Sequence, residues 1–151
     1  MKLYPATLAD LPAMASVHAQ AFVAPWDEAA FAMFFTGSGA YAVMAAAEDP
    51  AGVVLCRALA GEAEVLTLAV APWARRRGLG ADLMRAAIAK ARAAAAASMF
   101  LEVDVANVAA VGLYGRLGFA RAGLRRAYYD RGPGGRADAL VMRLDLTNAD
   151  Q

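Results

Sequence analysis

Apolar residues follow two different periods along this chain, and the period changes from one segment to the next. Spacings of three and four positions, as in Leu11, Met14 and Val17, predict amphipathic helices. Short apolar runs between turn residues predict strands. Helices are expected over residues 10–21, 27–35, 80–97 and 107–117, with Asp10 as the N-cap of the first. Strands are expected over residues 1–5, 41–47, 53–60, 64–70, 99–105, 120–129 and 137–146.

This order of elements, βααβββαβαββ, predicts an α/β fold of the mixed α+β kind, in which helices flank a central mixed β-sheet. No repeat or linker interrupts the order, so residues 1–146 are expected to form one domain and residues 147–151 a short polar tail. The last two strands are predicted to form a hairpin around the glycine-rich segment 131–135.

Composition limits the classes of protein that fit. Hydrophobic residues make up 60% of the 151 residues and charged residues 19%, which excludes wholesale disorder. The 15 Lys and Arg residues face 14 Asp and Glu residues, so no direct binding of nucleic acid is expected. One cysteine, Cys56, cannot form a disulfide framework or a Cys-rich zinc site, and no metal is expected. Because the sequence shows no signal peptide or long apolar span, we expect a cytoplasmic protein without membrane contact, as a monomer or weak dimer.

The segment 70–80 places three arginines and two glycines between a strand and the longest helix. Backbone N–H groups freed by the glycines, the helix N-terminus and the arginine charges together favour a ligand with phosphate groups. The segment is not a Walker A loop, because it lacks Gly-Lys-Ser/Thr. It does not match a Rossmann fingerprint either, which would need a third glycine and an acidic residue about 20 residues downstream. The pyrophosphate loop of an acyl-CoA-dependent transferase remains possible, as does a solvated arginine loop with a structural role only.

Polar residues near the third and fourth helices are the other candidates for chemistry. Glu102 and Asp104 alternate with apolar residues of a strand and share one face, where a partly desolvated carboxylate suits a general base. They can equally form a surface pair on an edge strand. Asn107 and Tyr114 lie seven residues apart on nearly the same side of a helix, although an N-cap and a core aromatic would give the same pattern. His18, on an apolar stripe, is expected to be a packed core histidine.

Together these stretches resemble the GNAT acetyltransferases. Arg76-Arg-Gly-Leu-Gly80 is similar to the acetyl-CoA motif Q/R-x-x-G-x-G/A of that family. The resemblance is closer to the RimI branch, the N-terminal alanine acetyltransferases of a small-subunit ribosomal protein. It covers nearly the whole chain, and its most specific part is the run Leu-Glu-Val…Asn…Leu-Tyr…Leu-Gly-Phe with a later Tyr-Tyr pair. The matching residues are 25–28, 66–70, 76–80, 101–103, 107, 113–114, 117–119, 125–129 and 139–142.

The resemblance implies the GNAT acyl-CoA N-acyltransferase fold, with acetyl-CoA as co-substrate and no metal. It implies that Glu102 is the proton acceptor and Tyr114 the proton donor. The residues it assigns to the cofactor are Leu68, Ala69, Val70, Arg76, Arg77, Gly78, Leu79, Gly80, Ala81 and Asn107. The candidate contacts to the acceptor, the N-terminal peptide of a ribosomal protein, are Trp26, Asp104, Tyr128 and Tyr129, and Trp26 can equally be a core residue. Asp104 and Asp130 depart from the pattern of the RimI relatives, which bears on the choice of acceptor.

Direct transfer in a ternary complex is the mechanism that fits these residues. An α-amino group has a pKa of about 7.7–8.0 and lysine one of about 10.4, so deprotonation near neutral pH costs roughly 1 and roughly 4–5 kcal/mol respectively. A single carboxylate is adequate for the former. Proton transfer from a tyrosine near 10 to a thiol near 8.5 is uphill by about 2 kcal/mol. Two alternatives stay open: a GNAT enzyme acting on protein lysine or a small amine, and a non-catalytic acyl-CoA-binding module, against which the presence of both Glu102 and Tyr114 argues.

Overall fold

Helices and strands make up most of the computed structural model. It describes residues 1–130 and 136–147. For residues 127–130 and 136–137, only the backbone is described. The described helices are α1 (Leu11–Ala21), α2 (Glu28–Phe35), α3 (Leu79–Ala93) and α4 (Val108–Arg116). The described strands are β1 (Lys2–Pro5), β2 (Ala40–Ala46), β3 (Pro50–Leu59), β4 (Glu62–Val70), β5 (Ser98–Asp104), β6 (Ala120–Asp130) and β7 (Arg136–Asp145). The order is the expected one, with two short 3-10 turns added, η1 (Leu8–Asp10) and η2 (Pro72–Ala74). None of the described helices is long and apolar enough to cross a membrane.

The strands form one mixed sheet in the order β1-β2-β3-β4-β5-β7-β6. Strands β1 to β4 pair antiparallel with their neighbours, and so do β5, β7 and β6. The two groups join through a parallel pair, β4 and β5, which α3 connects as a crossover. β6 and β7 pair as the predicted hairpin requires, while the predicted turn at 131–135 and residues 148–151 of the predicted tail lie outside the described residues.

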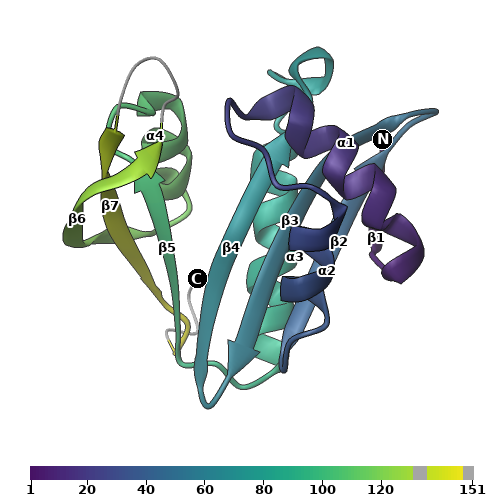
Figure 1. Ribbon diagram of the computed structural model, residues 1–151. Coiled ribbons are helices and arrows are strands. Elements are labelled where there is room, and N and C mark those ends of the chain that lie inside the picture. The colour runs from purple at the N-terminus through teal and green to yellow at the C-terminus, as the bar shows by residue number, and fades with distance from the viewer. Residues whose placement is uncertain (131–135, 148–151) are drawn as a thin grey trace.

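Helices cover both faces of β1 to β4 (Figure 1). On one face, α1 and α2 bury residues such as Met14 and Phe31 against Val53 and its neighbours. On the other face, α3 and α4 contribute to the larger core cluster. The alanine-rich sequence of α3 favours a helix and turns the same side to the sheet at every third or fourth position. The buried residues of α3 are Leu79, Leu83, Met84, Ala87, Ile88 and Ala91.

Strands β5, β7 and β6 have a helix on one face only. Leu101 and Val103 of β5 pack in the same cluster as Tyr114 of α4. Figure 1 shows α4 behind these strands and no described helix in front of them. Because side chains alternate along a strand, Glu102 lies on the face without a helix, as the sequence predicts.

Strands β4 and β5 diverge along most of their length. Their pairing extends only from Glu62–Ser98 to Glu64–Phe100, although both strands continue well beyond that level. Figure 1 shows them moving apart toward their carboxyl ends. A register shift opposite Leu66 gives β4 one extra residue relative to β3, and such bulges bend a strand. The facing edges of β4 and β5 are therefore free of each other in their carboxyl-terminal halves.

The structure differs from the sequence prediction in detail at two helix ends. The helix expected over 80–97 ends at Ala93, because Ala95 has a left-handed φ of 63° and the N–H of Ala97 donates to a carbonyl in the β3–β4 turn. Asp10 is the N-cap residue of α1, as expected, but its carboxylate makes no capping hydrogen bond to that helix. It accepts from the N–H of Thr7 at 2.8 Å and so closes the capping box of η1.

Candidate active site

The edge of β4 that faces β5 offers backbone hydrogen-bonding groups where the two strands have separated. The N–H of Ala71 donates to Ala51 of β3 at 2.8 Å. Because backbone groups alternate in an antiparallel ladder, Leu68 and Val70 direct their N–H and C=O groups away from β3. The carbonyl of Val70 accepts from Nε of Arg75 at 3.2 Å, which agrees with this direction. The N–H groups of Leu68 and Val70 therefore point into the space between the diverging strands.

The loop before α3 has the backbone geometry of an anion site. Arg76 and Gly78 have φ values of 66° and 73°, and Gly78 caps α3 without any side-chain hydrogen bond. The first intrahelical bond runs from the N–H of Asp82 to the carbonyl of Gly78. The N–H groups before Asp82 have no partner within the helix and carry the positive end of its dipole. Left-handed residues next to such a helix start turn successive N–H groups to one side, as in phosphate-binding nests.

Glu102 forms an ion pair with Arg125, a partner that the sequence does not predict. Its Oε1 lies 2.6 Å from Nη1 of Arg125, and its side chain is 22% exposed. Arg125 belongs to β6 and pairs with Ala139 of β7, while Glu102 of β5 pairs with Val141 of the same strand. The ion pair thus bridges two strands that are not neighbours in the sheet. No local spacing in the sequence signals it, because it depends on the strand order β5-β7-β6.

Tyr114 lies on the other side of the sheet from Glu102. It is 7% exposed and packs edge-on to Phe119, with 5.9 Å between ring centroids. Burial raises the pKa of Tyr114 well above its ordinary value, so the phenol stays protonated at neutral pH. Complete proton transfer to a thiolate therefore costs more than the sequence-based figure of about 2 kcal/mol, and transfer concerted with bond cleavage fits better.

Two other predicted site residues have structural roles at the start of α4. Asn107 is the N-cap, and its Oδ1 accepts from the N–H of Ala110 at 3.2 Å. Asp104 accepts from the N–H of Ala106 at 2.9 Å and so shapes the turn that leads from β5 into α4. The N-cap that the sequence left open as an alternative is thus present at Asn107.

His18 and Trp26 lie in an aromatic cluster under the α1–α2 connection. His18 is 2% exposed; its Nε2 lies 2.9 Å from Oγ1 of Thr67, and its Nδ1 accepts from the N–H of Trp26 at 2.9 Å. Burial lowers the pKa of His18 to about 4, so the ring is neutral and packed, as predicted. Trp26 stacks on Phe34 with 4.8 Å between ring centroids. This packing agrees with the core role, one of the two roles that the sequence leaves open for Trp26.

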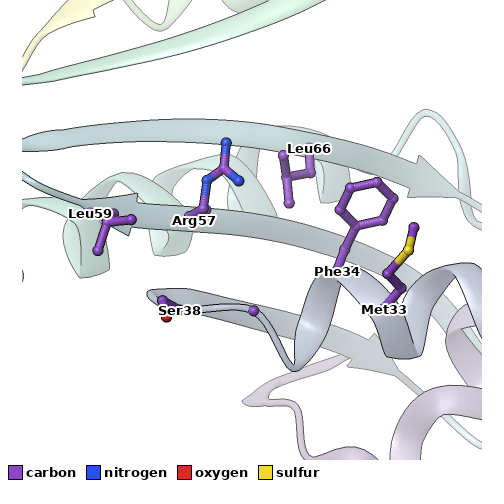
Figure 2. A pocket seen from close by; sticks show the side chains of 7 residues that line it. Met33, Phe34, Ser38, Arg57, Leu59 and Leu66 are labelled. Atoms are coloured by element: carbon purple, nitrogen blue, oxygen red, sulfur yellow. The ribbon is translucent and has the colours of Figure 1, made fainter.

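A pocket of about 340 Å³ lies beside the end of α2, and no pattern in the sequence indicates it. Figure 2 shows side chains from α2, β3 and β4 around it. Its lining residues are Met33, Phe34, Gly37, Ser38, Arg57, Leu59 and Leu66. Met33 and Leu59 are 65% and 55% exposed, and such exposure of apolar residues becomes visible only in the folded chain. The side chains of Tyr128, Tyr129 and Asp130 lie outside the described part of the structure.

Comparisons with known proteins agree over nearly the whole chain. The model of the Acetyltransferase (GNAT) family matches residues 11–119. The ribosomal protein bS18-alanine N-acetyltransferase of Escherichia coli (strain K12) is 35% identical over 147 residues, which cover 91% of this chain and 93% of the relative. The N-alpha-acetyltransferase RimI of Mycobacterium tuberculosis is 39% identical over 146 residues, with 92% and 89% covered. The crystal structure of the ribosomal-protein-S18-alanine N-acetyltransferase from Escherichia coli superposes with a TM-score of 0.90 at 32% identity, covering 98% of this chain and 95% of that one, which confirms the predicted fold.

Proposed function

The chain belongs to the GNAT family of acetyl-CoA-dependent N-acetyltransferases, and from that premise we propose that it acetylates the α-amine of an N-terminal alanine of a small-subunit ribosomal protein. The observation that carries the proposal is the divergence of β4 and β5, with Glu102 on one face of the sheet and Tyr114 on the other. The names of the relatives supply the acceptor class. Ribosomal proteins are made in the cytoplasm, and we place the enzyme there.

The backbone geometry fits acetyl-CoA at two points. The nest formed around Arg76 and Gly78, with the N-terminus of α3, suits the pyrophosphate. Arg76 and Arg77 add positive charge from exposed side chains. A side chain at Gly80 would meet Cδ2 of Leu113 at 3.3 Å, so glycine keeps α3 and α4 close to each other here. The assigned cofactor residues thus combine a site for the pyrophosphate with a strand edge that can bind the extended part of acetyl-CoA between the pyrophosphate and the thioester.

Residues on the two faces of the sheet have different roles in the proposed reaction. Acetyl-CoA supplies an acyl group activated as a thioester. Glu102 accepts a proton from the acceptor α-ammonium, so that the neutral nitrogen can attack the thioester carbon. The N–H groups of Leu68 and Val70 hold the thioester oxygen as negative charge develops on it. Tyr114 donates a proton to the sulfur as the carbon–sulfur bond breaks, and the proton released from the acylated nitrogen balances the one that Tyr114 gives up.

A transfer assay with labelled acetyl-CoA tests which amine is the acceptor. Three peptides are compared: one with a free N-terminal alanine, the same peptide with a blocked N-terminus, and a blocked peptide containing lysine. We expect transfer to the first only, because one carboxylate is adequate for an amine that costs roughly 1 kcal/mol to deprotonate. Transfer to the lysine peptide would replace the proposal by a lysine acetyltransferase. Binding of acetyl-CoA without transfer to any amine would favour a non-catalytic module.

A further inference from the structure

The face of the sheet that carries Glu102 is hollowed beside α2. We call the pocket lined by Met33, Phe34, Leu59, Leu66 and their neighbours the α2 pocket. Its walls are mostly apolar carbon, and Figure 2 shows Phe34 and Leu66 on adjacent sides of it. A second hollow of about 310 Å³ adjoins it and also reaches β5.

The α2 pocket opens on the same face of the sheet as the candidate base. The last recorded pair between β4 and β5 is Glu64 with Phe100. If that register is continued by two residues, Leu66 stands opposite Glu102 across the diverging strands. Leu66 packs with the cluster on the α1 and α2 face, and Glu102 is on the same face because it alternates with Leu101. The pocket wall and the carboxylate thus face the same side of the sheet.

The second hollow connects the pocket to the strand of the candidate base. The two hollows share Arg57 and Leu59, and the second is also lined by Phe100, two residues before Glu102 on the same face of β5. Arg57 is held by Glu64 at 2.9 Å, so the floor between the hollows carries a neutralised ion pair. The concave surface therefore extends from α2 to Phe100, and Glu102 follows two residues later on the same face of β5.

We propose that the α2 pocket binds an apolar side chain at the second or third position of the acceptor polypeptide. The inference rests on the proposed function, because the acceptor α-amine must reach Glu102. Each extended residue spans about 3.3–3.6 Å, so the residues next to the N-terminus lie within reach of Leu66. The opposite face is covered by α3 and α4, which leaves the acceptor chain this side of the sheet. Phe34, stacked on Trp26, gives the pocket a fixed aromatic wall.

The test compares peptides that begin with alanine and carry Phe, Leu, Gly or Asp at position two or at position three. With the wild-type enzyme we expect kcat/KM to be about tenfold higher for Phe or Leu than for Gly or Asp at one of these positions. Met33→Glu places a charge on the exposed rim of the pocket and should remove that preference through KM. The same variant should leave kcat, the KM of the Gly peptide and the affinity for acetyl-CoA unchanged.

Leu8→Glu is the matched control, because Leu8 is 57% exposed, like Met33 at 65%, and lies outside the pocket. It should keep the preference of the wild-type enzyme. Equal kcat/KM across the peptide series, or an unchanged preference in Met33→Glu, would overturn the role of the pocket and leave the proposed function standing. Absence of transfer to any free N-terminus would overturn both.

Discussion

Glu102 is positioned by a residue that lies far away in the sequence. Arg125 reaches from β6 across β7 to bind the carboxylate at 2.6 Å. A charge-assisted hydrogen bond of this kind fixes the direction of a side chain as well as its charge. The carboxylate is therefore already oriented on the open face of the sheet before an acceptor arrives, which reduces the ordering needed on binding.

The state of Cys56 also favours direct transfer. This free thiol is fully buried, and burial raises its pKa to about 12. Since the thiolate is the nucleophilic form of cysteine, Cys56 is protonated and shielded at neutral pH. Cys56 therefore offers no accessible thiolate to take up an acyl group, which agrees with the proposed direct attack of the acceptor amine on the thioester.

Glu102→Gln and Tyr114→Phe test the assigned proton acceptor and donor. Each keeps the size of the side chain and removes the group that moves a proton, so kcat should fall by about 10²-fold or more, as for general acid–base groups. The dissociation constant of acetyl-CoA, measured by calorimetry, should stay within about twofold. Tyr41→Phe is the control, because burial likewise raises the pKa of Tyr41 and its hydroxyl donates to Ala87. Wild-type turnover in both site variants would refute the assignment.

At the scale of elements, local rules explain what the sequence predicted. Alternation along β5 placed Glu102 opposite Leu101, and helical spacing placed His18 in the core; both depend only on neighbouring residues. The ion pair with Arg125 and the divergence at Leu66 were not predicted. They depend on which strands become neighbours and on a bulge, and these are set by packing between distant segments.

The loop before α3 can be tested with two glycines that share a backbone conformation. Gly78 has φ 73° and Gly61 has φ 83°, and a methyl group at either position would meet no atom within 4 Å. Alanine at each should lower the free energy of unfolding by about 1–2 kcal/mol, since left-handed backbone is strained for L-residues. Only Gly78→Ala should weaken acetyl-CoA binding, because it disturbs the N–H groups at the start of α3. Equal affinity in the two variants, measured by calorimetry, would argue against a phosphate site in this loop.

At the scale of the whole molecule, the two halves of the sheet are covered by helices to different extents. Strands β1 to β4 are covered on both faces, and together with α1, α2 and α3 they provide most of the buried core. Strands β5, β7 and β6 are covered by α4 alone among the described helices, which leaves the Glu102 face accessible (Figure 1). Because the two halves separate beyond Glu64 and Phe100, groups on opposite faces can act on one bond between them.

The stability of the fold should depend on pH through His18. In the folded chain its pKa is about 4, against about 6.5 in an unfolded chain, so the unfolded state binds more protons between these values. The free energy of unfolding is therefore highest above pH 6.5 and falls as the pH drops toward 4, by at most about 3 kcal/mol from this residue. Urea unfolding at a series of pH values measures the slope. His18→Gln retains an acceptor for the N–H of Trp26 and cannot titrate, so it should lose this part of the slope while the carboxylates contribute equally to both proteins. Parallel curves for wild type and variant would show that His18 is protonated in the folded chain at a pH close to its ordinary pKa, and that its burial does not stabilise the neutral form.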